Sequence, residues 1–476
     1  MAEYLRPDVY VEETISGEKP IQSVSTSTGA FVGVTARGKV GEAVLVTSWT
    51  DFVNKFALGL DTPFIKNSDL PNAVFGFFQN GGARCYIVRV APTGAKNAKC
   101  NIASEGLEIQ AKDPGSWANQ VLKVKVVANA SNFNVEVYMK NERVEVIENL
   151  SNTLSDINYF KDVINDVSNY IMVADADSKD LVVTEESVAL VGGDDAIATL
   201  EDTDFEKGLS ALNVVEDVNL VAVPDRSSIA QKIIDYCEGR GCHPILEAPK
   251  DATLETVKEF REELQGDVGA LYFPHIKIVD PIGRNSKSLK VCSPVGHIMG
   301  VYARIDSTRG VHKAPAGEEC ILKGVTDLSI NFPFTSISEL NPLGINCLIT
   351  KPNKGIMIWG ARSLSDNNNK KYVSDVRYDL MVRKSVYEGT QYAIFEPNDS
   401  ELWNRIDTSL RSFLDSEHKK GALRGATSEE AYYVKCDAEL NTDSVIDEGK
   451  VVAEIGYAKQ KPAEFVIVKI VQMQNK

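Results

Sequence analysis

The sequence contains no stretch of about 18 or more apolar residues, and its start lacks the basic segment and apolar run of a secretion signal. We therefore expect a protein that is made in the cytosol and does not insert into a membrane. The motifs GxGxxG, GxxxxGK[ST] and HExxH are also absent. Their absence disfavours dehydrogenases, P-loop nucleotidases and zinc proteases.

The spacing of the cysteines and the shortage of basic residues exclude further classes of protein. The eight cysteines are scattered without a CxxC pair, which disfavours a zinc ribbon or a disulfide framework and predicts reduced, buried thiols. The 51 Lys and Arg are outnumbered by 67 Asp and Glu, giving a net charge of −16. Because binding of nucleic acid through its phosphates needs a basic surface, we expect no nucleic-acid partner, and we predict neither a cofactor nor a metal.

Candidate catalytic residues are few. The five histidines are far apart in the sequence. Cys237 and Cys242 precede His243 and suggest a thiol nucleophile, but a histidine that begins a strand after a glycine-containing loop needs no catalytic role. Asp225 ends a strand, where parallel sheets often bind ligands, and its alternative role is a helix cap. We therefore predict no catalytic residue.

Acidic residues concentrate in residues 98–195, where 17 Asp and Glu accompany 8 Lys and Arg. Strand-like runs at 120–128 and 134–140 are followed by a polar stretch that we expect to be helical, and residues 187–193 would form an exit strand. We predict that this segment is an inserted, β-rich, acidic domain exposed to solvent.

The flanking sequence has an α/β pattern. Residues 218–281 alternate apolar strands with amphipathic helices as βαβαβ, which predicts a mostly parallel sheet buried on both faces. A second α/β portion would comprise strands at 355–362 and 391–395, helices at 374–388 and 400–418, and strands at 431–436 and 451–457. One face of the helix at 400–418 is apolar and contains Leu402, Ile406, Leu410, Phe413 and Leu414.

Both ends of the sequence carry a strand-like segment. Residues 8–13 alternate at the two-residue period of a strand, and residues 465–471 are nearly all β-branched, apolar or aromatic. Such segments either complete the sheet of their own domain or pair with another chain. The residues alone leave both alternatives open.

Several long stretches, in the same order along the chain, resemble contractile tail sheath proteins of bacteriophages and of phage-like contractile injection systems such as R-type bacteriocin particles. Residues 6–57 resemble the start of these proteins, and 73–90 (AVFGFFQNGGARCYIVRV) resemble their helix, Asn-Gly-Gly turn and strand. Residues 113–119 (DPGSWAN) resemble the point where a variable insertion begins. The most distinctive stretch is 296–317 (GHIMGVYARIDSTRGVHKAPAG), which resembles the core signature of the family.

The resemblance covers roughly residues 1–95 and 195–476, and the acidic insertion matches least. Shorter stretches at 325–328, 340–346 and 355–364 continue it towards the terminal PAEFVIVKI. Taken singly, the glycines of the core signature would indicate turns; these are Gly296, Gly300, Gly310 and Gly317.

The resemblance implies a multidomain α/β and α+β fold. A central α/β domain with a mostly parallel, subtilisin-like sheet would carry the insertion, and a second, C-terminal α/β domain would lie next to an inner tube. Extended arms with exchanged β-strands would form the two ends. The expected parts are residues 25–97 with 196–350 (central), 98–195 (insertion), 351–457 (C-terminal), and 1–24 and 458–476 (arms).

The resemblance also implies a structural subunit that is not an enzyme. It would form stacked hexameric rings around an inner tail tube and contract by rigid-body movement, with baseplate and tail terminator proteins as further partners. Assembly would take place in the cytoplasm of a bacterial host, and the virion or phage-like particle would be extracellular after release. A hydrolase on the α/β core and a passive, non-contractile filament are the competing interpretations.

By the same resemblance, the two arms would exchange strands between subunits, with hinges at residues 17–24 and 458–462. Tube contacts would come from the helix at 374–388, and the alternative for those residues is a solvated helix face with local ion pairs. The expected strand-exchange residues are Val9, Tyr10, Val11, Phe465, Val466, Ile467, Val468 and Ile470, and the expected tube contacts are Arg377, Arg383 and Lys384.

Overall fold

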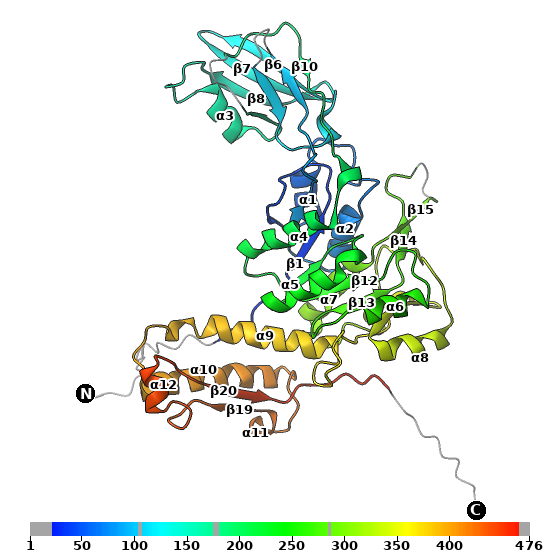
Figure 1. Ribbon diagram of the computed structural model, residues 1–476, viewed down its shortest axis with the longest axis vertical. Coiled ribbons are helices and arrows are strands. Elements are labelled where there is room, and N and C mark those ends of the chain that lie inside the picture. Colours follow the sequence, from blue (N-terminus) through cyan, green and yellow to red (C-terminus); the bar gives the residue numbers. More distant parts are fainter. Residues whose placement is uncertain (1–20, 103–106, 175–179, 284–286, 466–476) are drawn as a thin grey trace, which may run out of the picture. The chain divides into compact units, whose positions relative to one another are not determined.

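The computed structural model describes residues 21–102, 107–174, 180–283 and 287–465 (Figure 1). The chain divides into two compact units, Ser25–Arg377 and Met1–Val24 with Tyr378–Lys476. The division falls inside helix α9 (Val373–Gly389). The domain boundary expected between residues 350 and 351 thus lies before the observed one.

The larger unit is built on an eight-stranded sheet of order β18-β17-β13-β12-β11-β1-β3-β2. The strands from β17 to β3 are parallel, and the edge strands β18 and β2 are antiparallel to their neighbours. The βαβαβ prediction is therefore confirmed. The bounds are β1 (Gly29–Gly33), β2 (Val44–Val46), β3 (Cys85–Arg89), β11 (Leu220–Ala222), β12 (His243–Glu247), β13 (Ala270–Phe273), β17 (Ile345–Lys351) and β18 (Gly355–Ile358).

The assignment of strand β18 to the C-terminal domain, which was expected from the sequence, is wrong. The strand pairs with β17 through residues such as Leu348 and Ile358, so it completes the large sheet. Strands β14 (Ile276–Val279), β15 (Leu289–Cys292) and β16 (Asp327–Leu328) form a separate three-stranded antiparallel sheet in the same unit.

Helices cover both faces of the large sheet, as side-chain alternation along β1 shows. The ring of Phe31 lies 5.6 Å from that of Phe77 in α2, whereas the next residue, Val32, lies against Gly208 in α4. Successive residues of one strand therefore meet helices on opposite faces, which explains why β1 is buried at every position. The helices of this unit outside the insertion are α1 (Trp49–Phe56), α2 (Leu70–Asn80), α4 (Asp202–Ala211), α5 (Ala230–Arg240), α6 (Thr256–Glu262), α7 (Val295–Arg309), α8 (Ile337–Leu340) and the start of α9.

Helices α2 and α7 pack closely against each other at two glycines. A Cβ atom built on Gly296 would lie 2.0 Å from the carbonyl oxygen of Ala73, and one built on Gly300 would lie 2.4 Å from that of Phe77. Both glycines are inside α7, so the turn interpretation is wrong for them. The core signature is mainly a buried helix whose glycines allow a close helix crossing.

The insertion contains two antiparallel sheets around a hydrophobic core of its own, with α3 (Phe160–Val167) alongside. The runs expected as strands form β6 and β7, and the exit segment contains the short β10. The polar stretch after residue 140, expected to be helical, begins with strand β8. One sheet has β4 (Lys99–Asn101), β5 (Glu108–Ala111) and β9 (Ile171–Val173), and the other has β6 (Leu122–Asn129), β7 (Asn132–Met139), β8 (Glu142–Leu150) and β10 (Val188–Ala189).

Two buried arginines attach the root of the insertion to the central sheet region. The guanidinium of Arg37 pairs with Asp113 at 3.2 Å and lies 4.3 Å from the ring centroid of Trp117. Arg89 donates to the carbonyl oxygens of Gly38 at 2.8 Å and Pro114 at 2.7 Å. The free-energy cost of burying these two guanidinium groups is small because each has several hydrogen-bond partners.

The smaller unit contains the C-terminal part of α9, helix α10 (Ser400–Lys419) and a two-stranded antiparallel sheet of β19 (Tyr432–Lys435) and β20 (Glu454–Tyr457). Short helices α11 (Ser428–Ala431) and α12 (Asp443–Asp447) complete it. The apolar face predicted for the helix at 400–418 is confirmed, because all five of its residues are buried.

One predicted strand of this unit is wrong. Residues Gln391–Ala393 form a single 3₁₀ turn instead of a strand. Phe395, at the end of the predicted strand, has a φ of 68°, which lies outside the β region, and its side chain is fully exposed. The apolar residues of this segment therefore form an exposed loop between α9 and α10.

We expect Gly296→Ala to lower the free energy of unfolding by about 1–3 kcal/mol, because the new methyl group overlaps the backbone of α2. Thermal denaturation of the purified chain would measure the change. The control is Gly239→Ala in α5, where an added Cβ meets no atom within 4 Å. Alanine there should leave stability unchanged or raise it by up to about 1 kcal/mol, and equal effects of the two variants would contradict the close crossing of α2 and α7.

Candidate functional site

The two-stranded sheet of the smaller unit is the first candidate site. Strand β19 pairs with β20 from Tyr432 opposite Tyr457 to Lys435 opposite Glu454. Within the described residues this sheet has no third strand. Because isolated two-stranded sheets are marginally stable and exposed edges bind further strands, the sheet is suited to accept a strand from another chain.

The segment that leads to the N-terminal arm is fixed to the smaller unit. Ile21 is buried, and its side chain leaves no space for a Cβ on Gly389 of α9. The hydroxyl of Ser23 donates to Glu417 at 2.7 Å, and the backbone N–H of Val24 donates to the hydroxyl of Ser385 at 3.0 Å. Residues 21–24 are thus anchored to this unit, and the hinge expected over 17–24 stays a prediction.

The segment that leads to the C-terminal arm is fixed to the same unit. The N–H of Arg424 donates to the carbonyl oxygen of Ala458 at 2.8 Å, and Leu423 and Lys459 form an antiparallel bridge. The ammonium group of Lys459 also pairs with Asp379 at 2.7 Å. Residues 458–459 therefore continue the sheet region, and the hinge expected over 458–462 stays a prediction.

Most of the expected strand-exchange residues lie outside the described residues. Phe465 is described: it is 73% exposed and is not part of a strand in this chain. Strand exchange therefore stays a prediction for Phe465 and for the seven residues outside the described part, which are Val9, Tyr10, Val11, Val466, Ile467, Val468 and Ile470.

The structure separates the three basic residues expected to contact a tube. Arg377 is not on an outer face of α9: its side chain is 3% exposed and forms a two-pronged ion pair with Asp306. It also lies 4.7 Å from the ring centroid of Tyr302. By contrast, Arg383 is exposed and Lys384 is half-buried. The expected surface position is wrong for Arg377 and fits Arg383.

The last turns of α9 and the loop after it have exposed apolar side chains that were not expected as a surface. Tyr387, Ile394 and Phe395 are all largely exposed, and Tyr387 lies one helical turn after Arg383. Ile394 and Phe395 lay in a pattern that indicated a strand, and Tyr387 lay in the expected helix at 374–388. The end of α9 thus carries both basic and aromatic exposed groups.

The thiol-nucleophile hypothesis does not fit the structure. Cys237, Cys242 and His243 are all buried, with exposed fractions of at most 1%. Burial raises the pKa of the Cys237 thiol well above its ordinary value and lowers that of the His243 imidazole. Burial therefore disfavours the thiolate form of Cys237 and leaves a substrate no access to it. The prediction that the cysteines are free and buried is confirmed for all eight.

A serine, a histidine and carboxylates do meet at the carboxyl ends of the parallel strands, although no sequence motif indicates this arrangement. Ser293 donates from its hydroxyl to Glu247, and the imidazole of His275 lies 3.7 Å from the same carboxyl group. All three side chains are at least 95% buried. Because a substrate cannot reach the hydroxyl, this arrangement does not form a hydrolase site.

Asp225 joins this group, which corrects its interpretation as a helix cap. The N-cap position of the 3₁₀ turn that follows is occupied by Arg226 and not by Asp225, and no side chain caps this turn. Asp225 has a φ of 63°, and its backbone N–H donates to Glu247 at 2.7 Å. Its carboxyl group interacts with that of Asp69, the residue that precedes α2.

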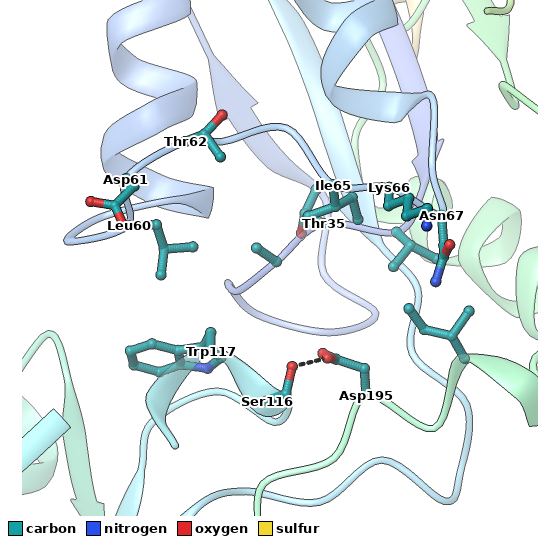
Figure 2. Close-up of a pocket in the computed structure, with 13 residues that line it drawn as sticks. Thr35, Leu60, Asp61, Thr62, Ile65, Lys66, Asn67, Ser116, Trp117 and Asp195 are labelled. Atoms are coloured by element: carbon teal, nitrogen blue, oxygen red, sulfur yellow. Dashed lines mark hydrogen bonds between the residues drawn. The ribbon is translucent and has the colours of Figure 1, made fainter. Parts of the chain in front are cut away.

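A cavity of about 390 Å³ lies between the loops after β1 and α1 and the root of the insertion. Figure 2 shows Ser116, Trp117 and Asp195 on one side of it and Thr35, Lys66 and Asn67 on the other. Ser116 donates to Asp195, so these groups satisfy each other. In the described part of the chain, no His, Cys, Asp and Glu side chains group as metal ligands, and no helix is long and apolar enough to cross a membrane.

Comparison with known families gives the class. Residues 191–364 match the family model of the phage tail sheath protein central domain, and residues 365–473 match that of the phage tail sheath C-terminal domain. Together the matches cover more than half of the chain. The chain therefore belongs to the phage tail sheath protein family, whose role is structural.

Two curated relatives agree with this assignment. A putative prophage major tail sheath protein of Pseudomonas aeruginosa is 26% identical over 171 residues, which are 35% of this chain and 42% of the relative. The tail sheath protein of Salmonella phage ViI is 22% identical over 313 residues, or 62% of this chain and 47% of the relative. The chain thus aligns with less than half the length of either relative.

Solved structures share the fold over nearly the whole chain. The helical sheath of the anti-feeding prophage in its contracted state has a TM-score of 0.63 at 21% identity and covers 99% of this chain and 100% of its own. The contracted sheath of the PVC extracellular contractile injection system has a TM-score of 0.61 at 21% identity, covering 99% of each chain. A sheath tail protein from Listeria innocua has a TM-score of 0.64 at 13% identity, covering 92% and 96%.

We expect Arg377→Met to lower the free energy of unfolding by about 3–5 kcal/mol, because Asp306 would stay buried without its partner. Arg383→Met, on the exposed face of the same helix, should change it by less than about 0.5 kcal/mol. Chemical denaturation of the two variants would compare them. A small effect at Arg377 would contradict the buried ion pair.

Proposed function

We propose that this chain is the subunit of a contractile tail sheath that forms stacked hexameric rings around an inner tail tube. One observation carries the proposal. The same small unit anchors the segments leading to both arms and contains a two-stranded sheet. A unit built in this way can donate two strands and accept two strands.

Strand donation would connect subunits without closing the assembly. Each arm would pair with the β19–β20 sheet of a different neighbour, which is a heterologous contact and produces open, helical polymers or stacked rings. The donated strands would contain Val9 to Val11 at one end and Phe465 to Ile470 at the other. Because residues 21–24 and 458–459 are anchored, the flexible part of each arm would lie beyond them.

Contraction would need no chemical fuel at the moment of firing. The extended sheath would be kinetically trapped, and the subunits would move as rigid bodies into tighter packing while the exchanged strands hold them together. An additional 100–200 Å² of buried apolar surface per subunit would supply roughly 2.5–5 kcal/mol, at about 25 cal/mol per Å². Summed over many subunits, this would drive the tube through a target cell envelope.

The remaining parts fit this role. The central unit would have a subtilisin-like sheet layout without a catalytic group, and the acidic insertion at 98–195 would lie on the outside of the sheath. The inner tube protein, the baseplate and the tail terminator would be the other partners. The particle would assemble in the cytoplasm of a bacterial host and act outside it after release.

The two competing functions have different support. The hydrolase is disfavoured because Ser293, His275 and Glu247 are buried. A passive filament shares the strand-exchange features, so assembly alone does not exclude it. Electron microscopy of sheath held on a tube would decide: two lengths support contraction, and a single length under all triggering conditions supports a passive filament.

Deletion of residues 465–476 should give a folded monomer that does not polymerise, because the donated C-terminal strand is lost. Size-exclusion chromatography and electron microscopy would show it. A shorter deletion of residues 472–476 leaves the strand-like segment intact and should still assemble. If the longer truncation still forms sheaths, strand donation by this end is wrong, and if it unfolds, the strand completes its own sheet.

We also propose that the end of α9 contacts the inner tube through Arg383 and Lys384, since Arg383 is exposed and Tyr387 and Phe395 are exposed nearby in the sequence. Reversing both charges with glutamate should weaken assembly around tubes at least tenfold while leaving subunit stability unchanged.

The matched control for this prediction reverses Lys66 and Lys232, two exposed lysines of the larger unit. This control changes the net charge by the same amount at positions far from α9 in the sequence. If the effect came from net charge alone, both double variants would weaken assembly equally. Co-sedimentation of sheath with purified tubes would measure the difference. Unchanged assembly of the Arg383 and Lys384 variant would rule out this tube contact.

A further inference from the structure

The carboxyl ends of β1 and β11 form a special position in the large sheet. The chain passes from β1 to β3 on one side and from β11 to β12 and β13 on the other, so the strand order reverses between β1 and β11. Open α/β sheets leave a crevice outside the strand ends at such a reversal, and ligands often bind there. In this chain the position is filled by its own acidic side chains.

Three carboxyl groups meet there, those of Asp69, Asp225 and Glu247, which we call the carboxyl trio. Asp69 accepts the backbone N–H of Ser293 at 2.9 Å and pairs with the ammonium group of Lys290 at 2.7 Å. The trio comes from three different elements, namely the start of α2, the loop after β11 and the end of β12. It therefore connects the ends of two paired neighbouring strands with the start of α2.

The two other carboxyl groups are linked through the backbone and through Ser293. One oxygen of Glu247 accepts the N–H of Asp225 at 2.7 Å, and the other accepts the hydroxyl of Ser293. Ser293 lies just before α7, so the group also fixes the start of that helix. The close crossing of α2 and α7 is thus held at one end by this polar cluster.

Three negative charges are not compatible with this site. Asp69 and Glu247 are at least 95% buried, and Lys290 is the one cation with a direct ion pair to the trio among the described residues. Burial raises the pKa of Glu247 to about 8, and the neighbouring Asp225 and Asp69 add to the shift. Burial and the charge of Asp69 raise the pKa of Asp225 to about 7. Burial opposes ionisation of Asp69 as well, but Lys290 and the hydrogen bonds from Asp225 and Ser293 together offset it and lower the pKa of Asp69.

We propose that the carboxyl trio is a proton-dependent latch that holds the ends of β11 and β12 against the starts of α2 and α7. The latch is closed while Asp225 and Glu247 hold protons, because only Asp69 is then charged and Lys290 neutralises it. Loss of the two protons places three negative charges side by side, two of them on fully buried residues and that of Asp225 on a half-buried one, and the strand ends separate from the helix ends. This inference concerns the larger unit alone and does not depend on sheath assembly.

The direction of the pH effect follows from the two raised pKa values. The folded chain keeps protons that the unfolded chain releases near the ordinary pKa values of 3.8 and 4.5. The stabilisation is therefore complete below about pH 4 and is lost as the pH rises through 7 to 8.

Other titrating groups around the latch act outside the range from pH 6.5 to 8.5. Burial lowers the pKa of His275 to about 4, so its contribution is complete above its ordinary value of 6.5 and is lost only as the pH falls. His297, in α7, behaves in the same way. Burial raises the pKa of Cys292 well above 9. Lys250 and Asp251 are further charged groups near the site.

Native-state hydrogen exchange on the unassembled full chain tests the latch. After correction for intrinsic exchange, the protection factors of amides in β11 and β12 should fall about tenfold per pH unit between pH 7 and 8 for each proton released on opening. Glu247→Gln and Asp225→Asn imitate the protonated groups, so each should reduce this slope and keep high protection at pH 8.5. Glu259→Gln, at an exposed carboxylate on α6, should match the wild type.

A second measurement does not depend on how well the variants fold. Infrared difference spectra of the wild-type chain should show the carbonyl band of a protonated carboxylic acid at pH 6.5, and the band should disappear by pH 9. The proposal is overturned if the wild-type chain lacks this band at pH 6.5. It is equally overturned if protection of β11 and β12 is independent of pH, or if Glu247→Gln keeps the wild-type slope.

Discussion

Burial of a parallel sheet on both faces is the constraint on which the rest of the structure depends. Helices must cover each face closely, and this requires the glycines at the crossing of α2 and α7. Burial of the sheet also places the ends of the strands, with their polar residues, in the interior of the unit. Each buried charge there needs a partner, as Arg377 has in Asp306 and Asp69 has in Lys290.

The parts of the fold with a clear period were predictable from sequence. The βαβαβ segment has continuous apolar strands between amphipathic helices, and α10 has an apolar face at helical spacing, so local pattern and tertiary burial agree. Strand β8 was missed because its charged residues conceal the alternation that includes Val144 and Val146. The segment 391–395 was assigned as a strand because apolar composition does not reveal the positive φ of Phe395.

The candidate sites were predictable only where they are local in sequence. Cysteine spacing was enough to predict free, buried thiols, and the helical position of Arg383 agreed with its exposure. Arg377 was misplaced because its partner, Asp306, is 71 positions away and helical periodicity contains no information about it. The meeting of Asp69, Asp225 and Glu247 depends on the sheet order, which a single sequence does not contain.

The contacts of Arg89 have a consequence for the evolution of the outer surface. Its guanidinium binds backbone carbonyl oxygens, including that of Pro114 at the root of the insertion, and every amino acid supplies such an oxygen. The Arg89 contacts therefore make little demand on the side chains of the inserted domain, whereas Arg37 needs the carboxylate of Asp113 and the ring of Trp117. A domain joined in this way can diversify while the rest of the subunit stays unchanged, provided that it keeps an acidic and an aromatic side chain for Arg37.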